Sequence, residues 1–357
     1  MSRSLALTLP QELVDIIVDN LKSSKKGLRK CSFISHRYLH RVRKYSFSTL
    51  TFNTWVEQGD TKDPFHVDGL SELLSSSQNV FGDEFKLGNY IHDLAIFCEP
   101  GEAQEAIVDL QRLVALLKCL PSLQSLRLTR VTLSCSVDSD IPTNAFNLAK
   151  MELSVIRPRN KTILPSFFSL FAKITTLNMH SYTYIHPAKS EYWPGIPYPT
   201  SKPQVEHLLV STLFHPEYLD ILAECIDYTL IKSVSLRCAL TFNQVETLLL
   251  SIARTVENLW IRPSFSPNCK TWRLPICPRL TSLTLRIYFK DQRSLETQEQ
   301  LWKDTVSILN SLEVSSTTER TPLRELEIEL GADSSRILAP LTCGPMENAY
   351  KHYYSLG

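Results

Sequence analysis

Residues Leu7–Leu21 read LTLPQELVDIIVDNL, and the rest of the chain is organised around this stretch. Its apolar side chains recur every three or four residues, which is the period of one face of an α-helix. They are Leu9, Leu13, Ile16, Ile17 and Leu21. Pro10 fits the first turn, where a backbone N–H has no helical partner. The stretch therefore predicts an amphipathic helix with an apolar stripe.

A second helical pattern follows the polar break KSSKKG at residues 22–27. Five side chains of the next stretch fall on one helical face: Leu28, Cys31, Ile34, Tyr38 and Val42. Two or three short helices within about forty residues bury too little surface to be stable alone. Their apolar stripe is therefore expected to pack on the rest of the chain or on another protein.

Residues 5–50 resemble the F-box family. The resemblance is carried by Leu9-Pro10, Glu12-Leu13, Ile16-Ile17, Leu21, the run Leu28, Cys31 and Ser32, then Ser35, Arg37 and the closing Arg43–Phe47. The family usually has Trp where this chain has Tyr38. The chain looks most like the F-box proteins of filamentous fungi, in which the motif leads directly into a repeat region.

This resemblance implies a substrate receptor of a Skp–cullin–F-box ubiquitin ligase. The implied partners are a Skp-type adaptor, a cullin bound through it, and an unknown target protein. Six residues are expected at the adaptor interface: Leu9, Pro10, Leu13, Ile16, Ile17 and Leu21. Four more are expected to pack or to extend that surface: Leu28, Cys31, Ile34 and Tyr38.

A repeated pattern occupies the chain from Ile91 onward. It consists of an apolar residue, two others, an apolar residue, one other and an apolar residue. Its nine middle residues are Leu94, Leu126, Met151, Leu177, Leu208, Val234, Leu259, Leu283 and Leu326, mostly 24–26 residues apart. This is the signature and period of a leucine-rich repeat. Phe47, Leu50 and Phe52 fit the same template and predict an entry strand.

Helical patterns lie between these predicted strands, at residues 103–120, 164–172, 217–230, 242–255 and 295–312. We therefore predict an α/β fold in which the F-box precedes a solenoid with parallel strands on its concave face and helices on its convex face. The Asn or Cys expected three residues after the third apolar position is replaced, for example by Val131 and Ile156, so the repeats are irregular.

The predicted organisation has three parts. Residues 1–50 form the helical module, residues 51–90 a linker or capping region, and residues 91–357 the repeat array. Within the array, residues 185–203 are a Pro- and aromatic-rich insertion with five Pro. Such an insertion is expected to be a surface loop, either a functional one or a stiff connector that packs its own aromatic rings.

The charge is unevenly distributed along the chain, and the cysteine usage indicates an intracellular protein. Residues 1–50 hold ten basic and three acidic residues, a net charge of +7, whereas the remainder carries −6. The sequence contains nine Cys without a C-x-x-C pair, which is typical of reduced thiols. We see neither a secretory signal nor an apolar run long enough to span a membrane. A cytoplasmic or nuclear location is expected.

The sequence contains no motif of a known catalytic site, so we expect a protein that is not an enzyme and uses no cofactor. Cys31, His36 and His40 are three candidate zinc ligands, but a fourth ligand is missing and the same residues fit the F-box helices. We therefore expect no metal.

The predicted concave face carries a candidate target-binding site. The residue after the third apolar position is Arg237, Arg262 and Arg286 in three successive repeats, and Trp260 lies two residues before Arg262. Neighbouring strands are about 4.8 Å apart, so these arginines could form one column that binds carboxylates or a phosphorylated segment. The alternative is an internal ion-pair row from Arg286 to Glu329.

Two other functions remain open at this stage. The chain could be a repeat scaffold with a vestigial F-box whose helices fold back on the array and bind no adaptor. Less expected is a nucleic-acid-binding protein that uses the basic N-terminal region. A small docking module before a broad repeat surface indicates an interaction protein, and the receptor interpretation is preferred because of the resemblance to the F-box family.

Overall fold

We describe a computed structural model of the chain at residues 10–33, 36–53, 87–98, 106–135, 141–158, 162–180, 201–211, 217–263, 272–289, 302–311 and 323–332. The chain divides into two compact units. The first comprises residues 1–141 and 156–159, and the second comprises residues 142–155 and 160–357. The predicted linker lies outside the described residues except for residues 51–53 and 87–90, and the Pro-rich insertion lies outside them except for residues 201–203.

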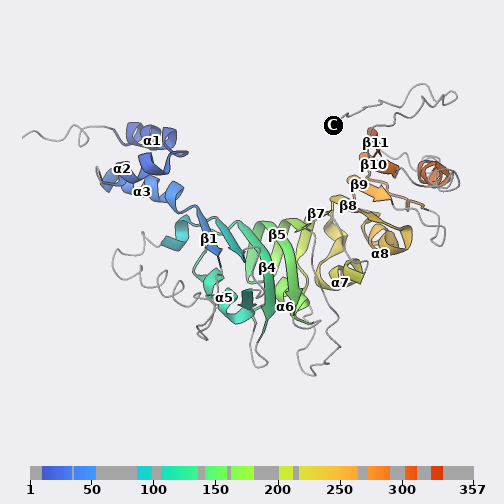
Figure 1. Ribbon diagram of the computed structural model, residues 1–357, viewed down its shortest axis with the longest axis horizontal. Coiled ribbons are helices and arrows are strands. Elements are labelled where there is room, and N and C mark those ends of the chain that lie inside the picture. Colours follow the sequence, from blue (N-terminus) through green and yellow to red (C-terminus); the bar gives the residue numbers. More distant parts are fainter. Residues whose placement is uncertain are drawn as a thin grey trace, which may run out of the picture. The chain divides into compact units, whose positions relative to one another are not determined.

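The first unit begins with a module of three short helices, α1 (Gln11–Asn20), α2 (Lys25–Ser32) and α3 (His36–Ser46), shown in blue in Figure 1. Pro10 precedes the first turn of α1. Ser24 caps α2 because its hydroxyl accepts a hydrogen bond from the Gly27 N–H. Both α2 and α3 pack on their neighbours in the module.

Strands follow the helical module in the same unit. Their order across the sheet is β1 (Thr49–Asn53), β2 (Asp93–Phe97) and β4 (Ser125–Ser134), and β3 (Ala106–Asp109) also pairs with β4. All these pairs are parallel. The 3-10 turn η3 (Leu87–Tyr90) precedes β2, and α5 (Leu110–Lys118) lies on one side of the strands (Figure 1).

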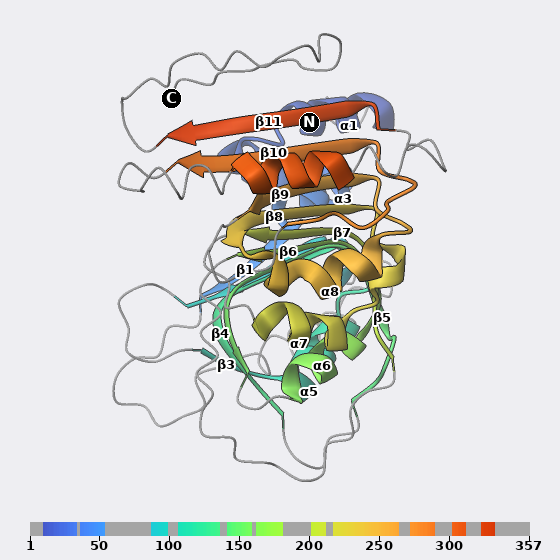
Figure 2. The ribbon, with the colours of Figure 1, turned by 90° about the vertical axis from the view of Figure 1, so that its right-hand side faces the viewer.

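The second unit is dominated by a parallel sheet with the order β5-β6-β7-β8-β9-β10-β11. Its strands are β5 (Phe146–Pro158), β6 (Phe171–His180), β7 (Gln204–Ser211), β8 (Ser233–Leu240), β9 (Asn258–Pro263), β10 (Ser282–Phe289) and β11 (Glu325–Ala332). The end of β5, from Ile156 on, is counted with the first unit. Its helices are α6 (Ile163–Ser169), α7 (Glu217–Cys225), α8 (Phe242–Ile252) and the helical residues 302–311, with the 3-10 turn η4 (Tyr228–Leu230) after α7. The helices α6, α7 and α8 follow one another along one face of the sheet (Figure 2).

The register of the strands follows the repeat found in the sequence. In the first unit Leu94 pairs with Leu126. In the second unit every middle residue of the pattern pairs with the middle residue of the next strand, from Met151 to Leu326. The predicted α/β class, with a large parallel sheet and several helices, is thereby confirmed.

The same face of each strand forms the core. The second and third apolar residues of every pattern from β2 to β10 are at most 3% exposed. Because side chains alternate along a strand, these residues face the helices and the residues between them occupy the open face. In β11 the corresponding Leu326 and Ile328 are half-buried.

Two strands interrupt this alternation at the same repeat position. Arg130 in β4 and Val155 in β5, each two residues after the third apolar residue, have φ of 57° and 55°. A left-handed residue resets the alternation, so that the next residues, Val131 and Ile156, are buried. These apolar side chains stand where the repeat consensus has Asn or Cys, which explains how the irregular repeats fill that position.

The structure tests several predictions that were made from the sequence. The entry strand proposed around Leu50 and Phe52 is β1, which pairs with β2. The helix predicted at residues 103–120 is wrong at its start, because Ala106–Asp109 form β3 and the helix begins at Leu110. The side chain of Asp109 caps that helix by accepting hydrogen bonds from Gln111 and Arg112. Among the described residues, no helix is long and apolar enough to cross a membrane.

Gly88 in η3 provides a test of the packing in the first unit. A Cβ atom at this position would overlap the backbone carbonyl oxygen of Cys119. We expect Gly88→Ala to lower the free energy of unfolding by about 1–3 kcal/mol, the usual cost of overpacking. Urea unfolding followed by circular dichroism measures it. Gly27→Ala is the control, because its added methyl group meets side-chain atoms that can shift, and an equal loss there would contradict the explanation.

Candidate functional site

The helical module has its own small core. Six residues are buried together: Val14, Val18, Leu28, Cys31, Tyr38 and Val42. Leu21 and Tyr45 pack against this cluster and are partly buried. Each of the three helices contributes to the core, so the module closes on itself through α1, α2 and α3.

A second face of α1 is apolar and exposed. Leu13, Ile16 and Ile17 are 46%, 55% and 39% exposed. We call these three residues the α1 patch. Pro10, which precedes the helix, is also exposed. Large aliphatic side chains normally lie inside a folded protein, so the informative feature is that three of them gather on one short helix.

Helical geometry explains why α1 has two apolar faces. Each residue advances about 100° around the axis, so positions 14, 18 and 21 share one face and positions 13, 16 and 17 share another. The sequence prediction followed the stripe through Leu13, Ile16 and Ile17 and missed Val14 and Val18. Val14, Val18 and Leu21 are spaced by four and three residues, which is the signal that would have revealed the second face.

The ten predicted adaptor-interface residues fall into three groups. Pro10 and the α1 patch are exposed. Leu28, Cys31 and Tyr38 are buried in the module core, and Leu21 packs against it, so these four take the packing role. Leu9 and Ile34 lie outside the described residues. Phe33, which follows α2, is 80% exposed and was not singled out from the sequence.

A polar contact fixes α1 on α3. The Asp19 carboxylate accepts hydrogen bonds from Arg41 Nε at 2.7 Å and Nη2 at 2.6 Å, and from the Tyr45 hydroxyl at 2.7 Å. The bonds from Arg41 and Tyr45 lower the pKa of Asp19 to about 2. The bidentate geometry orients α1, because the guanidinium holds both carboxylate oxygens.

The predicted arginine column does not form at Arg237. The register of β8 shifts between Leu236 and Ala239, and Arg262 pairs with Ala239. A bulge inserts residues into one strand, so Arg237 falls outside the row. Arg286 forms an ion pair with Glu329 at 3.3 Å, which is the alternative that the sequence left open. Trp260 is half-buried and pairs with Ser235 and Thr284.

Other polar residues on the open face of the second unit bridge neighbouring strands. Glu206 lies between Lys173 and Lys232, and these lysines lower its pKa to about 2. Nδ1 of His180 lies 2.7 Å from the Ser211 hydroxyl, and Nε2 lies 3.6 Å from Glu152. Such cross-strand pairs stabilise the alignment of neighbouring strands.

The sequence offered three candidate zinc ligands, Cys31, His36 and His40. Cys31 is buried in the module core, and the side chains of His36 and His40 lie outside the described ones. In the part of the chain that the structure describes, no group of three or more His, Cys, Asp and Glu residues could hold a metal ion.

Comparisons of the whole chain with protein-family models and with curated proteins find no match.

The contact between Asp19 and Arg41 predicts how the module responds to acid. An unfolded Asp has a pKa of about 3.9, and the folded value is about 2. A lowered pKa stabilises the fold above the unfolded value, and this contribution is lost as pH falls from about 4 towards 2. We expect the melting temperature followed by circular dichroism to fall over this range less steeply in Asp19→Asn than in the wild type.

Asp15→Asn is the matched control for this experiment. Asp15 lies on the same helix and accepts a hydrogen bond from Gln11 within α1. It should retain the acid dependence of the wild type. Identical slopes for Asp19→Asn and the wild type between pH 4 and pH 2 would contradict the assignment.

Proposed function

We propose that the chain is the substrate-recognition subunit of a Skp–cullin–F-box ubiquitin ligase. In this proposal the helical module is an F-box that binds a Skp-type adaptor, and through it a cullin. The α1 patch carries the proposal, because it is an exposed apolar surface on a module whose own core is already filled by Val14 and Val18.

The size of the patch suits a docking contact. Complete burial of one large aliphatic side chain contributes about 1.5–3 kcal/mol, so burying the exposed parts of Leu13, Ile16 and Ile17 contributes a few kcal/mol. The gain is available on binding because α1 is held in place by the internal core and by Asp19 and Arg41. A preformed helix face loses little conformational freedom when a partner covers it.

The exposed charge of the module gives a second property of the partner. Four basic side chains of α2 are exposed: Lys25, Lys26, Arg29 and Lys30. A partner that contacts α2 as well as the α1 patch would match them with acidic residues beside an apolar groove. Such complementarity increases the association rate and favours one partner over others.

The repeat region supplies the second half of the proposal. We propose that the parallel strands and their helices form an irregular leucine-rich-repeat solenoid, supported by the shared register of the middle residues. Its open face would bind the target protein, and ubiquitin transfer would be performed by other subunits. The chain would thus be a non-catalytic receptor that works in the cytoplasm or the nucleus.

The main alternative is a scaffold with a vestigial F-box whose helices fold back on the array. That alternative requires the apolar stripe of α1 to be covered by the chain itself. The exposure of Leu13, Ile16 and Ile17 favours the receptor.

Co-purification with a Skp-type adaptor tests the proposal. We expect a stoichiometric complex with the wild type, and at least about a hundredfold weaker binding of the double variant Leu13→Asp, Ile16→Asp, because two charges would be buried without partners. These positions are exposed, so the free chain should remain folded. Leu250→Asp on α8 is the matched control, because Leu250 is also exposed and lies in the other unit.

Two results would contradict the proposal. One is a wild-type chain that forms no complex with the adaptor. The other is a double variant that binds as well as Leu250→Asp does.

A further inference from the structure

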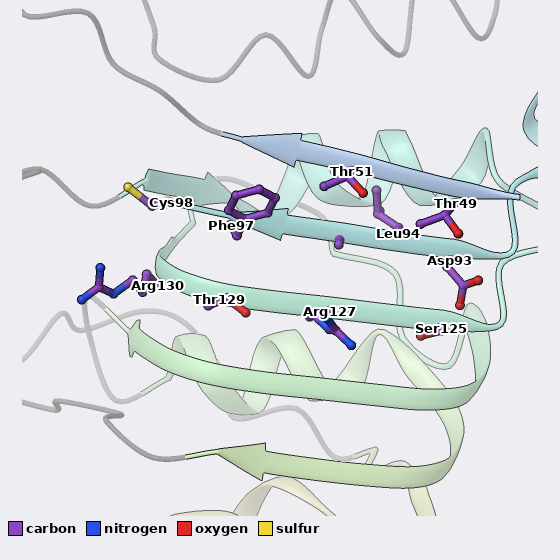
Figure 3. A pocket seen from close by; sticks show the side chains of 11 residues that line it. Thr49, Thr51, Asp93, Leu94, Phe97, Cys98, Ser125, Arg127, Thr129 and Arg130 are labelled. Carbon is purple, nitrogen blue, oxygen red and sulfur yellow. The ribbon is translucent and has the colours of Figure 1, made fainter. Parts of the chain in front are cut away.

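A groove with a volume of about 600 Å³ lies on the open face of β1, β2 and β4 in the first unit (Figure 3). It exists because Ala95, in the middle strand, has only a methyl group. Its neighbours in the same row are Thr51 on β1 and Arg127 on β4. The side chain on the floor of the groove is therefore small, whereas the strands on either side carry larger polar side chains.

The two ends of the groove differ in charge. Figure 3 shows Asp93 and Ser125 at the end where the strands begin, and Arg130 and Cys98 at the opposite end. Arg127 lies between them on β4. Five residues separate Ser125 from Arg130, which corresponds to about 17 Å along a strand. The groove thus offers an acidic end and a basic end within the length of about five extended residues.

The backbone of Arg130 places this side chain at the groove. Regular alternation would turn residue 130 to the buried side, with Leu126 and Leu128. Its φ of 57° is in the left-handed region, and Arg130 instead lines the groove. At this residue β4 ends its pairing with β2 and begins its pairing with β3.

The lining matches the chemistry of a peptide that carries an anionic side chain. A guanidinium group binds a carboxylate or a phosphoryl group through two parallel hydrogen bonds, and the hydroxyl of Thr129, in the strand between Arg127 and Arg130, adds a donor. Half-buried Phe97 offers an apolar surface to a neighbouring side chain of the peptide. Asp93 repels an anion at the other end and so favours the basic end as the place of the anionic side chain.

We propose that this groove binds an extended segment of the target protein, with a carboxylate or phosphoryl side chain at Arg130. The proposal rests on the receptor function proposed above and names the class of target that the receptor recognises. It also moves the anion site from the predicted arginines of the second unit to the first unit. A nucleic acid fits less well, because Asp93 opposes a repeating phosphate backbone.

Fluorescence anisotropy with the full chain tests this site. The probes are labelled nine-residue peptide pools in which the central residue is phosphoserine, glutamate, serine or lysine. We expect the phosphoserine pool, the glutamate pool or both to bind at least about tenfold more tightly than the serine pool, as for a charge-assisted contact. The difference in affinity between the phosphoserine and glutamate pools shows whether the groove distinguishes a phosphoryl group from a carboxylate.

Variants at Arg130 separate charge from backbone conformation. Asn tolerates the left-handed region, so Arg130→Asn should keep the fold and reduce the preference for acidic pools by about tenfold. Arg130→Lys should restore part of the preference. Arg237→Asn is the matched control, because it removes one exposed arginine from the second unit, and it should bind like the wild type.

The outcomes distinguish this proposal from the receptor function. Equal binding of all four pools, or no binding of the acidic ones, overturns the groove, and so does a preference that survives Arg130→Asn. Tighter binding of a labelled oligothymidine than of any peptide pool also overturns it, in favour of nucleic acid. Adaptor co-purification is measured on the same variants and should be unchanged. Loss of the adaptor complex with retained peptide binding would contradict the receptor proposal and not the groove.

Discussion

The packing of Val14 and Val18 against the residues of α2 and α3 is the interaction on which the helical module depends. It uses one face of α1 to close the module around Leu28 and Tyr38. The bidentate contact between Asp19 and Arg41 then fixes the orientation of the helix. Because these contacts use one side of α1, the opposite side, with Ile16, is presented to a partner as a rigid surface. The stability of the module and its proposed docking function thus come from different residues of the same ten-residue helix.

The strands also separate a packed face from an exposed face, and they do so in every repeat. Within each unit, the middle apolar residue of the pattern pairs with its counterpart in the next strand, as Leu208 does with Val234. The residues between them do not pack in the core and form the open face. That face changes from strand to strand, from cross-strand ion pairs such as Arg286 with Glu329 to the groove around Ala95. A regular core therefore supports an irregular surface, which suits the recognition of a particular partner.

Much of the fold could be predicted because it depends on periodicity. The period of the apolar pattern placed the strands and their register, and the spacing of Leu28, Cys31 and Tyr38 identified one buried face. Local departures from periodicity could not be predicted in the same way. The bulge after Leu236 displaces Arg237 from its row, and the sequence carries no glycine there that would have signalled it.

The groove was missed for the same physical reason. Its basic end depends on the left-handed conformation of Arg130. Such a conformation is typical of glycine, so an arginine at this position does not predict it. Its depth depends on Ala95, a small residue whose effect appears when the side chains of the neighbouring strands are known. The second apolar face of α1 is different, because Val14, Val18 and Leu21 carry a readable spacing. The sequence interpretation followed the stripe with the larger side chains, Leu13, Ile16 and Ile17, and therefore missed this face.

The most direct measurement compares Ile16→Ala with Leu28→Ala in the chain alone, by hydrogen exchange of the α1–α3 amides. This exchange reports the local free energy of opening of the module. We expect Leu28→Ala to lower that free energy by about 2–5 kcal/mol, since it creates a cavity in the core. Ile16→Ala should change it by less than about 0.5 kcal/mol, as for other exposed positions. A loss at Ile16 as large as the loss at Leu28 would mean that the chain itself covers this face, and it would contradict the division of α1 into a packing face and a docking face.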